Sequence, residues 1–199
     1  MAACDWPVTQ LDRDYHDNEW GVPVHDDRTM FEHLMLEVMQ CGLSWGLMLK
    51  KRGVFRACFE GFDFDRIAAY TEDDVARIMA TDGMIRSERK IRAVIENARR
   101  YQAVRAEFGS FCDYLWRFTD GRTILYEGHA EGRVPAKNAL SERIAADLKA
   151  RGFKYVGGVT VYSHMQACGL INDHGGDCPC YARINAMADT VALPRDGEG

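Results

Sequence analysis

Four residues near the two ends of the chain carry the side chains of a metal site. Cys4 and His16 lie near one end, and His174 and Cys178 lie near the other with an H-x3-C spacing. Two cysteines and two histidines complete a tetrahedral zinc set without an open position, so such a site is structural and would tie the two ends together. Spacing alone also allows buried thiols beside hydrogen-bonded histidines. The spacing also leaves three other residues that could compete as metal ligands, namely Cys180, Cys168 and His164.

Large aromatic side chains gather in the N-terminal quarter of the chain. Trp6, Tyr15, Trp20 and Trp45 are close in sequence, and Glu37 lies between them on an apolar helical stripe. A carboxylate among apolar neighbours is costly unless something pairs with it. Stacked rings with one buried carboxylate suit a flat, polar and cationic ligand. The alternative is an aromatic core with a satisfied carboxylate.

A basic helical hairpin is predicted at about 72–104. Its two helices are joined by a short turn that contains Gly83, and Arg86, Arg89 and Lys90 follow it. Backbone N–H groups at such a turn can face a phosphate, which the basic side chains would reinforce. The pattern resembles the helix-hairpin-helix DNA-binding motif, although the second hairpin glycine is absent. An ordinary helical hairpin is the alternative.

Basic residues are clustered along the chain although its net charge is negative. The net charge is −5, yet the segment 77–105 has eight basic and three acidic residues, a net of +5. A second basic stretch consists of Lys50, Lys51, Arg52 and Arg56. Local patches, and not total charge, set phosphate affinity. A solvated helix face explains the same pattern.

Length and composition favour one ordered domain at 1–189. The chain has 199 residues, of which 47% are hydrophobic and 28% charged, an ordinary globular composition. It has no apolar run that could span a bilayer and no signal peptide, so we expect a cytoplasmic protein without a membrane segment. In the reducing cytoplasm, the seven cysteines favour metal binding over disulfides.

The chain is predicted to be almost entirely helical. The first 25 residues are expected to be irregular, residues 119–136 to form a loop, and residues 190–199 to be a disordered tail. Capping residues and apolar periodicity predict seven helices. Their approximate ranges are 26–42, 44–59, 71–83, 87–104, 110–118, 138–151 and 157–168.

Four segments together resemble one enzyme family, DNA-3-methyladenine glycosylase I. They are YHDNEWGVP from Tyr15, CGLSW from Cys41 with LKKR shortly after, KYVG from Lys154, and MQACGLINDH from Met165. The order and the spacing are those of the family from Cys4 to about Tyr181.

The resemblance implies an all-α, helix-hairpin-helix glycosylase fold with a structural Zn2+ that joins the termini. The implied ligands are Cys4, His16, His174 and Cys178. The implied site has Glu37 as the catalytic, base-contacting residue, and Tyr15 and Trp45, with Trp6 and Trp20, in the base pocket. Gly42 and Leu43 would wedge the duplex, and the hairpin with Gly83, Arg86, Arg89 and Lys90 would bind phosphate.

The chain departs from the family pattern at three places. Asp12 or Arg13 stands where a second tyrosine is common, and His164 stands where an aromatic residue is more usual. The run Gly46-Leu47-Met48 replaces small polar or β-branched residues after Trp45. These changes bear on the shape of the pocket and on lesion preference.

The implied activity is monofunctional excision of N3-methyladenine from double-stranded DNA by a monomeric enzyme that flips the base out. Glu37 suits recognition and orientation of the base. Asp113 fits the first turn of a helix that begins at Ser110 better than it fits a catalytic role. The alternative is a zinc-stabilised DNA-damage-binding module without turnover. A zinc hydrolase would need an open metal position.

Overall fold

The computed structural model describes residues 4–194. Its elements in chain order are α1 (Gln10–Asn18), α2 (Asp27–Gln40), α3 (Trp45–Cys58), the 3-10 turn η1 (Glu60–Phe62), α4 (Phe64–Ala68), α5 (Glu72–Ala80), α6 (Glu88–Phe108), α7 (Phe111–Trp116), η2 (Arg117–Thr119), β1 (Thr123–Tyr126), α8 (Ala139–Ala150), α9 (Gly158–Ala167), α10 (Pro179–Met187) and β2 (Thr190–Leu193).

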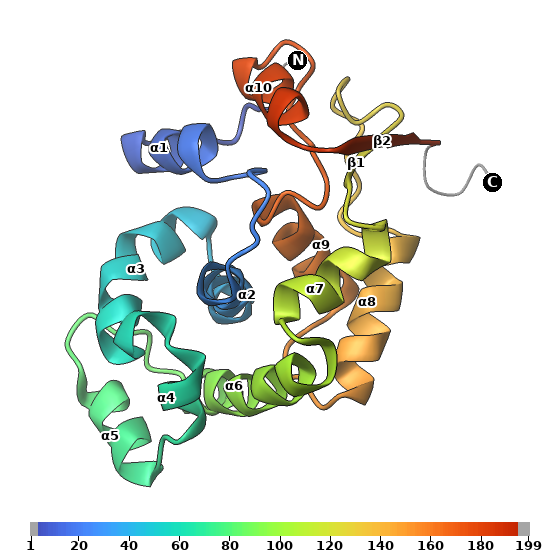
Figure 1. Ribbon diagram of the computed structural model, residues 1–199. Coiled ribbons are helices and arrows are strands. Elements are labelled where there is room, and N and C mark those ends of the chain that lie inside the picture. The colour runs from blue at the N-terminus through green and yellow to red at the C-terminus, as the bar shows by residue number, and fades with distance from the viewer. Residues whose placement is uncertain (1–3, 195–199) are drawn as a thin grey trace.

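Helix α2 is the centre of the fold. Figure 1 shows it end-on, with the other helices arranged around it. Ten of its fourteen residues are buried, among them Glu32, His33 and Glu37. A helix that is buried all round needs neighbours on every side, which α3, α6, α7 and α9 supply.

The predicted helices are present, because their starting signals are local. Asp26 accepts a hydrogen bond from Thr29 N, Ser44 from Leu47 N and Ser110 from Asp113 N, so each caps its helix. Thr71 and Asp74 form the predicted capping box of α5. That helix ends at Ala80, earlier than Gly83, because Thr81 already has extended backbone.

Two expectations about the N-terminal and C-terminal segments are wrong. The first 25 residues are not wholly irregular, because α1 forms on a capping box between Thr9 and Asp12. Thr190–Leu193 is not disordered, because it pairs in parallel with β1. The all-α prediction therefore omits a small two-stranded sheet. The rest of the predicted tail, from residue 195, lies outside the described residues.

The helical hairpin predicted at about 72–104 is present. The helices α5 and α6 flank a turn in which Gly83 has φ +76°, a backbone conformation that glycine adopts without strain. The segment before α1 contacts the loop before α10, where Gly175 N donates to Cys4 Sγ, whereas β2 leads away from both (Figure 1). Within residues 4–194, no helix is long and apolar enough to cross a membrane.

Candidate active site and metal centre

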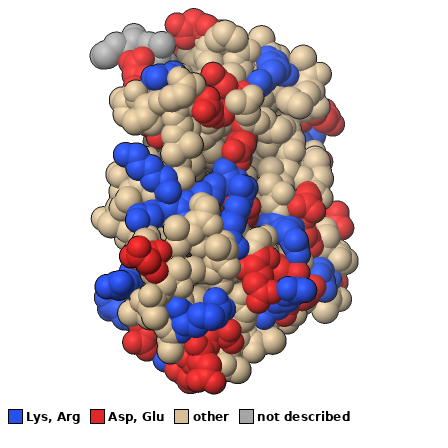
Figure 2. All heavy atoms as spheres, turned by 90° about the vertical axis from the view of Figure 1, so that its left-hand side faces the viewer, with Lys and Arg blue, Asp and Glu red and all other residues tan. Residues whose placement is uncertain are grey.

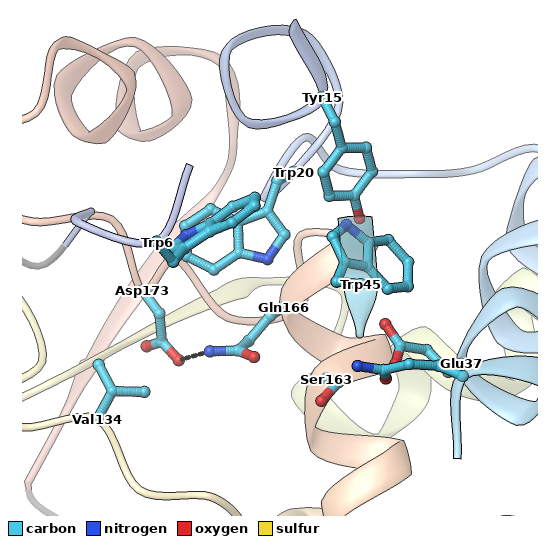
Figure 3. A pocket seen from close by; sticks show the side chains of 10 residues that line it. Trp6, Tyr15, Trp20, Glu37, Trp45, Val134, Ser163, Gln166 and Asp173 are labelled. Atoms are coloured by element: carbon cyan, nitrogen blue, oxygen red, sulfur yellow. Dashed lines mark hydrogen bonds between the residues drawn. The ribbon is translucent and has the colours of Figure 1, made fainter. Parts of the chain in front are cut away.

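A cavity of about 400 Å³ opens between α1, α2, α3 and α9. Figure 3 shows its lining. All five residues of the predicted aromatic and acidic cluster contribute to it. The lining consists of Trp6, Tyr15, Trp20, Glu37, Gln40, Trp45, Val134, Ser163, Gln166 and Asp173.

The aromatic rings of the cavity contact one another. The centroids of Tyr15 and Trp45 are 5.2 Å apart and those of Trp6 and Trp20 are 5.5 Å apart. Trp6 also meets Tyr15 edge-on at 6.3 Å. Helix α1 carries Tyr15, and Trp45 is the first residue of α3, which Ser44 caps. Two local helix starts thus bring the rings together.

The cavity contains polar groups that no described residue satisfies. The Tyr15 hydroxyl and the Trp45 indole N–H are buried without a hydrogen-bond partner. The Glu37 side chain is 5% exposed, and within residues 4–194 nothing donates a hydrogen bond to its carboxylate. Buried polar groups in native proteins are nearly always paired. Three unpaired groups around one cavity indicate a ligand that pairs with them.

Burial determines the protonation of Glu37. Its removal from water raises the pKa of the carboxyl group from 4.5 to about 8. The Glu37 carboxyl group is therefore mostly neutral at pH 7. A cation in the cavity would lower this pKa and restore the charged form.

The departures from the family pattern lie behind the cavity wall. His164 is buried, and its ring contacts the Cys168 thiol at 3.6 Å. Burial lowers the pKa of His164 to about 3, so its imidazole is neutral at physiological pH. Asp12 is buried in its capping box, and a Cβ on Gly46 would lie 3.3 Å from its Oδ1. These two departures therefore fit one another sterically.

Sequence patterns did not predict the polar side of the cavity, which carries Asp173 and Gln166. The buried Asp173 carboxylate accepts hydrogen bonds from His129 Nδ1 at 2.6 Å, Tyr162 Oη at 2.8 Å and Gln166 Nε2 at 2.8 Å. His129 and Tyr162 hold the Asp173 carboxylate, which in turn fixes the Gln166 amide beside the cavity, as Figure 3 shows for the last of these bonds. Asp173 and Gln166 both lie in the MQACGLINDH segment, which was the available signal.

The predicted wedge forms the connection between α2 and α3. Gly42 has φ +83°, a value that favours glycine. Leu43 is 38% exposed at the tip, and its N–H donates to Gln40 O at 2.6 Å. An exposed apolar side chain next to a cavity is suited to insertion between bases.

Lys90, which is predicted to bind phosphate, has its ammonium group bound to two backbone carbonyls within the protein. Its Nζ donates to Met39 O and to Cys41 O, each at 2.7 Å. These carbonyls end α2 and have no acceptor role within the helix, so the ammonium caps them and offsets the helix dipole. Lys90 therefore joins α6 to the wedge. Arg86 and Arg89 are exposed and keep their charge for a ligand.

The second basic stretch is partly neutralised. Arg52 and Arg56 both donate to the buried Glu32 carboxylate, at 2.5 and 2.9 Å. Lys50 and Lys51 on α3 are not in ion pairs within the described part of the chain. Figure 2 shows Lys and Arg gathered in the middle of the face formed by α3 and α5, with Asp and Glu above and below.

The four predicted metal ligands fall into two overlapping groups that share His16. Ligand atoms of Cys4, His16 and Cys178 lie within 4.8 Å of one another, and those of His16, His174 and Cys180 do too. Cys180 is thus a real neighbour of the site. The other predicted competitors, Cys168 and His164, belong to neither group and contact each other instead.

The two histidines are oriented as metal ligands. His16 Nδ1 is held by Asp17 Oδ1 at 2.7 Å, and His174 Nδ1 is held by Asn172 Oδ1 at 2.9 Å. Each ring thereby keeps Nε2 for a ligand bond, the arrangement of second-layer hydrogen bonds around metal sites. His174 Nε2 is buried without a partner. A cation with two thiolates would satisfy it, so these residues fit zinc.

Comparison with known proteins places the chain among methyladenine glycosylases. The model of the methyladenine glycosylase family matches residues 6–181. The Escherichia coli protein DNA-3-methyladenine glycosylase 1 is 44% identical over 91% of this chain and 97% of its own. A crystal structure of 3-methyladenine DNA glycosylase I has a TM-score of 0.84 at 47% identity and covers 89% of this chain and 98% of its own.

A third relative has been studied with a base. It is the 3-methyladenine DNA glycosylase I of Staphylococcus aureus, whose structure addresses 3-methyladenine recognition. It has a TM-score of 0.81 at 33% identity and covers 86% of this chain and 91% of its own.

Removal of the Lys90 ammonium should destabilise the protein. Lys90→Met leaves the carbonyls of Met39 and Cys41 without their donor, and we expect a loss of about 1–2 kcal/mol. That corresponds to a fall in Tm of roughly 3–6 °C for a chain of this length. Arg89→Met is the matched control, because Arg89 is exposed one position earlier. Equal melting of the two variants would contradict the capping role.

The buried Glu37 carboxyl should make stability depend on pH. Because its folded pKa of about 8 exceeds the unfolded value near 4.5, ionisation opposes folding, and stability falls as pH rises from about 4.5 to 8. Glu37→Gln abolishes this cost, so its Tm should equal that of the parent at pH 4.5. At pH 9 it should be higher by at least ~5 °C.

The control for this titration is Glu127→Gln, which changes an exposed carboxylate. Its melting curves should follow those of the parent at every pH. A Tm difference between Glu37→Gln and the parent that stays constant from pH 4.5 to 9 would show that Glu37 titrates normally.

Proposed function

This chain belongs to the methyladenine glycosylase family, and we propose that its aromatic cavity receives the N3-methyladenine base. The protein is a DNA-3-methyladenine glycosylase that excises this base from DNA in repair. One observation carries the assignment of the site. Tyr15 and Trp45 bring buried, unpartnered polar groups to a cavity with aromatic walls, and the buried Glu37 carboxyl group lines the same cavity.

The substrate needs little chemical activation. Methylation at N3 gives the base a positive charge and weakens its glycosidic bond. The protein must expose the base, recognise it and admit water to C1′. Flipping the base out of the stack costs a few kcal/mol, and less for a poorly paired base.

The aromatic walls favour the methylated base over adenine. Trp45 and Tyr15 provide faces against which a flat ring can stack. Cation–π attraction adds about 0.5–2 kcal/mol for a cationic ring and is absent for neutral adenine. The walls therefore discriminate by charge as well as by shape.

Glu37 discriminates through the same charge. A cationic base stabilises the carboxylate and lowers the pKa of Glu37 from about 8. The charged carboxylate then accepts hydrogen bonds from the base edge. This attraction declines as the bond to C1′ breaks and the departing base becomes neutral. Glu37 therefore acts in recognition and orientation of the base.

The surface around the cavity opening handles the DNA. Leu43 would fill the space left in the stack, and Arg86 and Arg89 would bind phosphates beside the hairpin turn at Gly83. Phosphate contacts and the wedge together offset the cost of flipping. The exposure of these side chains supports both roles.

We assign a monofunctional reaction to the enzyme. A lyase needs a nucleophilic lysine in its pocket, and the described residues that line the cavity include none. Asp113 follows the Ser110 cap in the first turn of α7, away from the cavity lining. We further propose a monomer that acts on duplex DNA in the cytoplasm, and the seven free cysteines are consistent with a reducing compartment.

We propose that Cys4, His16, His174 and Cys178 hold a structural zinc ion. The grouping of Cys4 and Cys178 with His16, the closeness of His174 to His16, and the orientation of both rings support it. A bound zinc ion supplies no chemistry to the cavity here. It joins the N-terminal segment to the loop before α10, and so adds to folding free energy.

Base release tests the proposed function. Alkylated duplex DNA is incubated with the enzyme, and the free bases are separated by chromatography. We expect 3-methyladenine from the parent, a reduction of about 10- to 100-fold in Glu37→Gln, and one of about 2- to 10-fold in Tyr15→Phe. Glu127→Gln is the control and should release base at the parental rate.

Three outcomes contradict parts of this assignment. If Glu37→Gln keeps parental turnover and parental lesion binding, the carboxylate has no role in recognition. If the parent binds the alkylated duplex without releasing base, the binding-module alternative is correct. A strand break without added base or heat would show a lyase.

Metal analysis tests the zinc site. We expect one zinc per chain by elemental analysis, loss of zinc in Cys178→Ser, and full zinc in Cys41→Ser, which changes another half-buried thiol. Cys180→Ser should also keep its zinc, and loss there would assign Cys180 as a ligand. Chelation should lower Tm and increase proteolysis near the termini. Loss of base release at unchanged Tm would instead indicate a catalytic metal.

A further inference from the structure

The base cavity contains a hydrogen-bond acceptor that the proposed function does not use. The Gln166 side chain reaches the cavity lining from the last turn of α9. Its amide nitrogen donates to Asp173 Oδ2 at 2.8 Å. Because a carboxylate only accepts hydrogen bonds, the amide must turn its NH2 group toward Asp173. The Gln166 carbonyl oxygen therefore lies on the side away from Asp173, as Figure 3 shows.

The orientation of this amide is fixed from behind. The Asp173 residue is 2% exposed, and its carboxylate also accepts hydrogen bonds from Tyr162 Oη at 2.8 Å and from His129 Nδ1 at 2.6 Å. Both of these donors belong to buried residues. The carboxylate therefore cannot turn away from Gln166 without unpairing a buried donor, which costs free energy. His129 lies between β1 and α8, so this loop acts on the cavity through Asp173.

The Gln166 carbonyl oxygen is available to a ligand. Across residues 4–194, no group donates a hydrogen bond to Gln166 Oε1. The residue is half-buried, so its oxygen is not sealed from the cavity that it lines. Its backbone oxygen accepts from Gly21 N and Gly169 N, which holds the main chain in place as well. The cavity thus presents an oriented acceptor to the molecule that occupies it.

Two helices supply acceptors to the same cavity. Glu37 lines it from α2, and Gln166 lines it from α9, which packs against α2. The exocyclic amino group of adenine is a donor with two hydrogens. It can therefore donate to the Glu37 carboxylate with one hydrogen and to the Gln166 oxygen with the other.

Charge and ring shape do not separate the two N3-methylated purines. N3-methyladenine and N3-methylguanine are both flat cations, so Tyr15 and Trp45 attract either ring through the same cation–π interaction. The two bases differ at C6, where adenine has an amino donor and guanine has a carbonyl acceptor. An acceptor of the protein that faces the guanine oxygen stays unpaired, and this costs free energy. An oriented acceptor in the cavity therefore favours adenine.

We propose that Gln166 is a specificity-determining residue whose Oε1 accepts a hydrogen bond from the 6-amino group of N3-methyladenine and thereby disfavours N3-methylguanine. Asp173 is a positioning residue, because it prevents the amide from turning over and offering its NH2 group to the guanine oxygen. This inference rests on the proposed function, since it assumes that the cavity receives the methylated base.

Competition between the two lesions tests the role of Gln166. The probe is duplex DNA methylated so that it contains both N3-methyladenine and N3-methylguanine, and the released bases are separated by chromatography at early times. We expect the parent to release N3-methyladenine at least ~10-fold faster per lesion. Gln166→Met removes the acceptor and keeps the length of the side chain. The ratio of the two rates should fall about 10-fold in this variant, mainly through slower release of N3-methyladenine.

The matched control is Gln102→Met. Gln102 on α6 is also a half-buried glutamine whose Nε2 donates to a carboxylate, that of Asp65, at 2.8 Å. It lies outside the cavity lining, so this variant should keep the parental rates and the parental ratio. The Tm of both variants is measured as well. A lower Tm with a parental ratio in Gln166→Met would show that Gln166 has a structural role only.

A second variant tests the positioning by Asp173. In Asp173→Asn the neighbour of Gln166 can donate as well as accept, so the Gln166 amide can turn its NH2 group to the cavity. Release of N3-methylguanine relative to N3-methyladenine should then rise about 3- to 10-fold. Tm is measured in parallel, because Asp173 precedes His174. If this variant does not fold, the ratio in Gln166→Met alone decides the proposal.

The outcomes also separate this inference from the proposed function. An equal loss of both rates in Gln166→Met would overturn the inference, because Gln166 would then hold a group common to both reactions, such as the attacking water. Equal release of the two bases by the parent would overturn it too. A parental ratio in folded Asp173→Asn would overturn the positioning role. Absence of any base release by the parent would instead refute the proposed function.

Discussion

The removal of Glu37 from water is the constraint on which the rest of the structure depends. An unpaired carboxyl group among apolar neighbours opposes folding, and the same burial raises the pKa of Glu37 to about 8. The fold tolerates it because α2 buries Leu34, Val38 and most of its other residues on all sides. The cavity is thus prepared for a cation at the expense of stability, as is common at functional sites.

The C-terminal end of α2 connects the proposed base cavity to the proposed DNA wedge. Glu37 lies on its last turns, Gln40 lines the cavity, and Leu43 follows three residues later. Lys90 fixes the final carbonyls of the helix from the first turn of α6. A duplex bound at the hairpin would therefore contact α6, which is hydrogen-bonded directly to the residues that lead into the wedge. The two hydrogen bonds of Lys90 thus set the spacing between the hairpin and the wedge.

The cluster of cysteines and histidines supports the opposite wall of the cavity. The His16 ring stacks on Trp20 with centroids 5.8 Å apart, and Trp6 meets His16 at 5.6 Å. His174 contacts Trp20 at 4.5 Å. Two of the four cavity rings thus pack on the side chains proposed to hold zinc. This contact gives a reason for the proposed zinc site, to which we assign no catalytic chemistry, to lie next to the proposed base cavity.

The sequence by itself determined seven of the helices, α2, α3 and α5 to α9, and the candidate types of chemistry. Caps such as Asp26, Ser44 and Ser110 and the apolar periodicity act over a few residues, so they can be read without the fold. Tertiary structure decided the pairing of β1 with β2, the role of Lys90 and the polar wall at Asp173. These depend on contacts between residues far apart in the chain: Lys90 meets carbonyls about 50 residues away, and His129 meets Asp173 from 44 residues away. No local pattern encodes such a distance, because the folded packing alone brings the partners together.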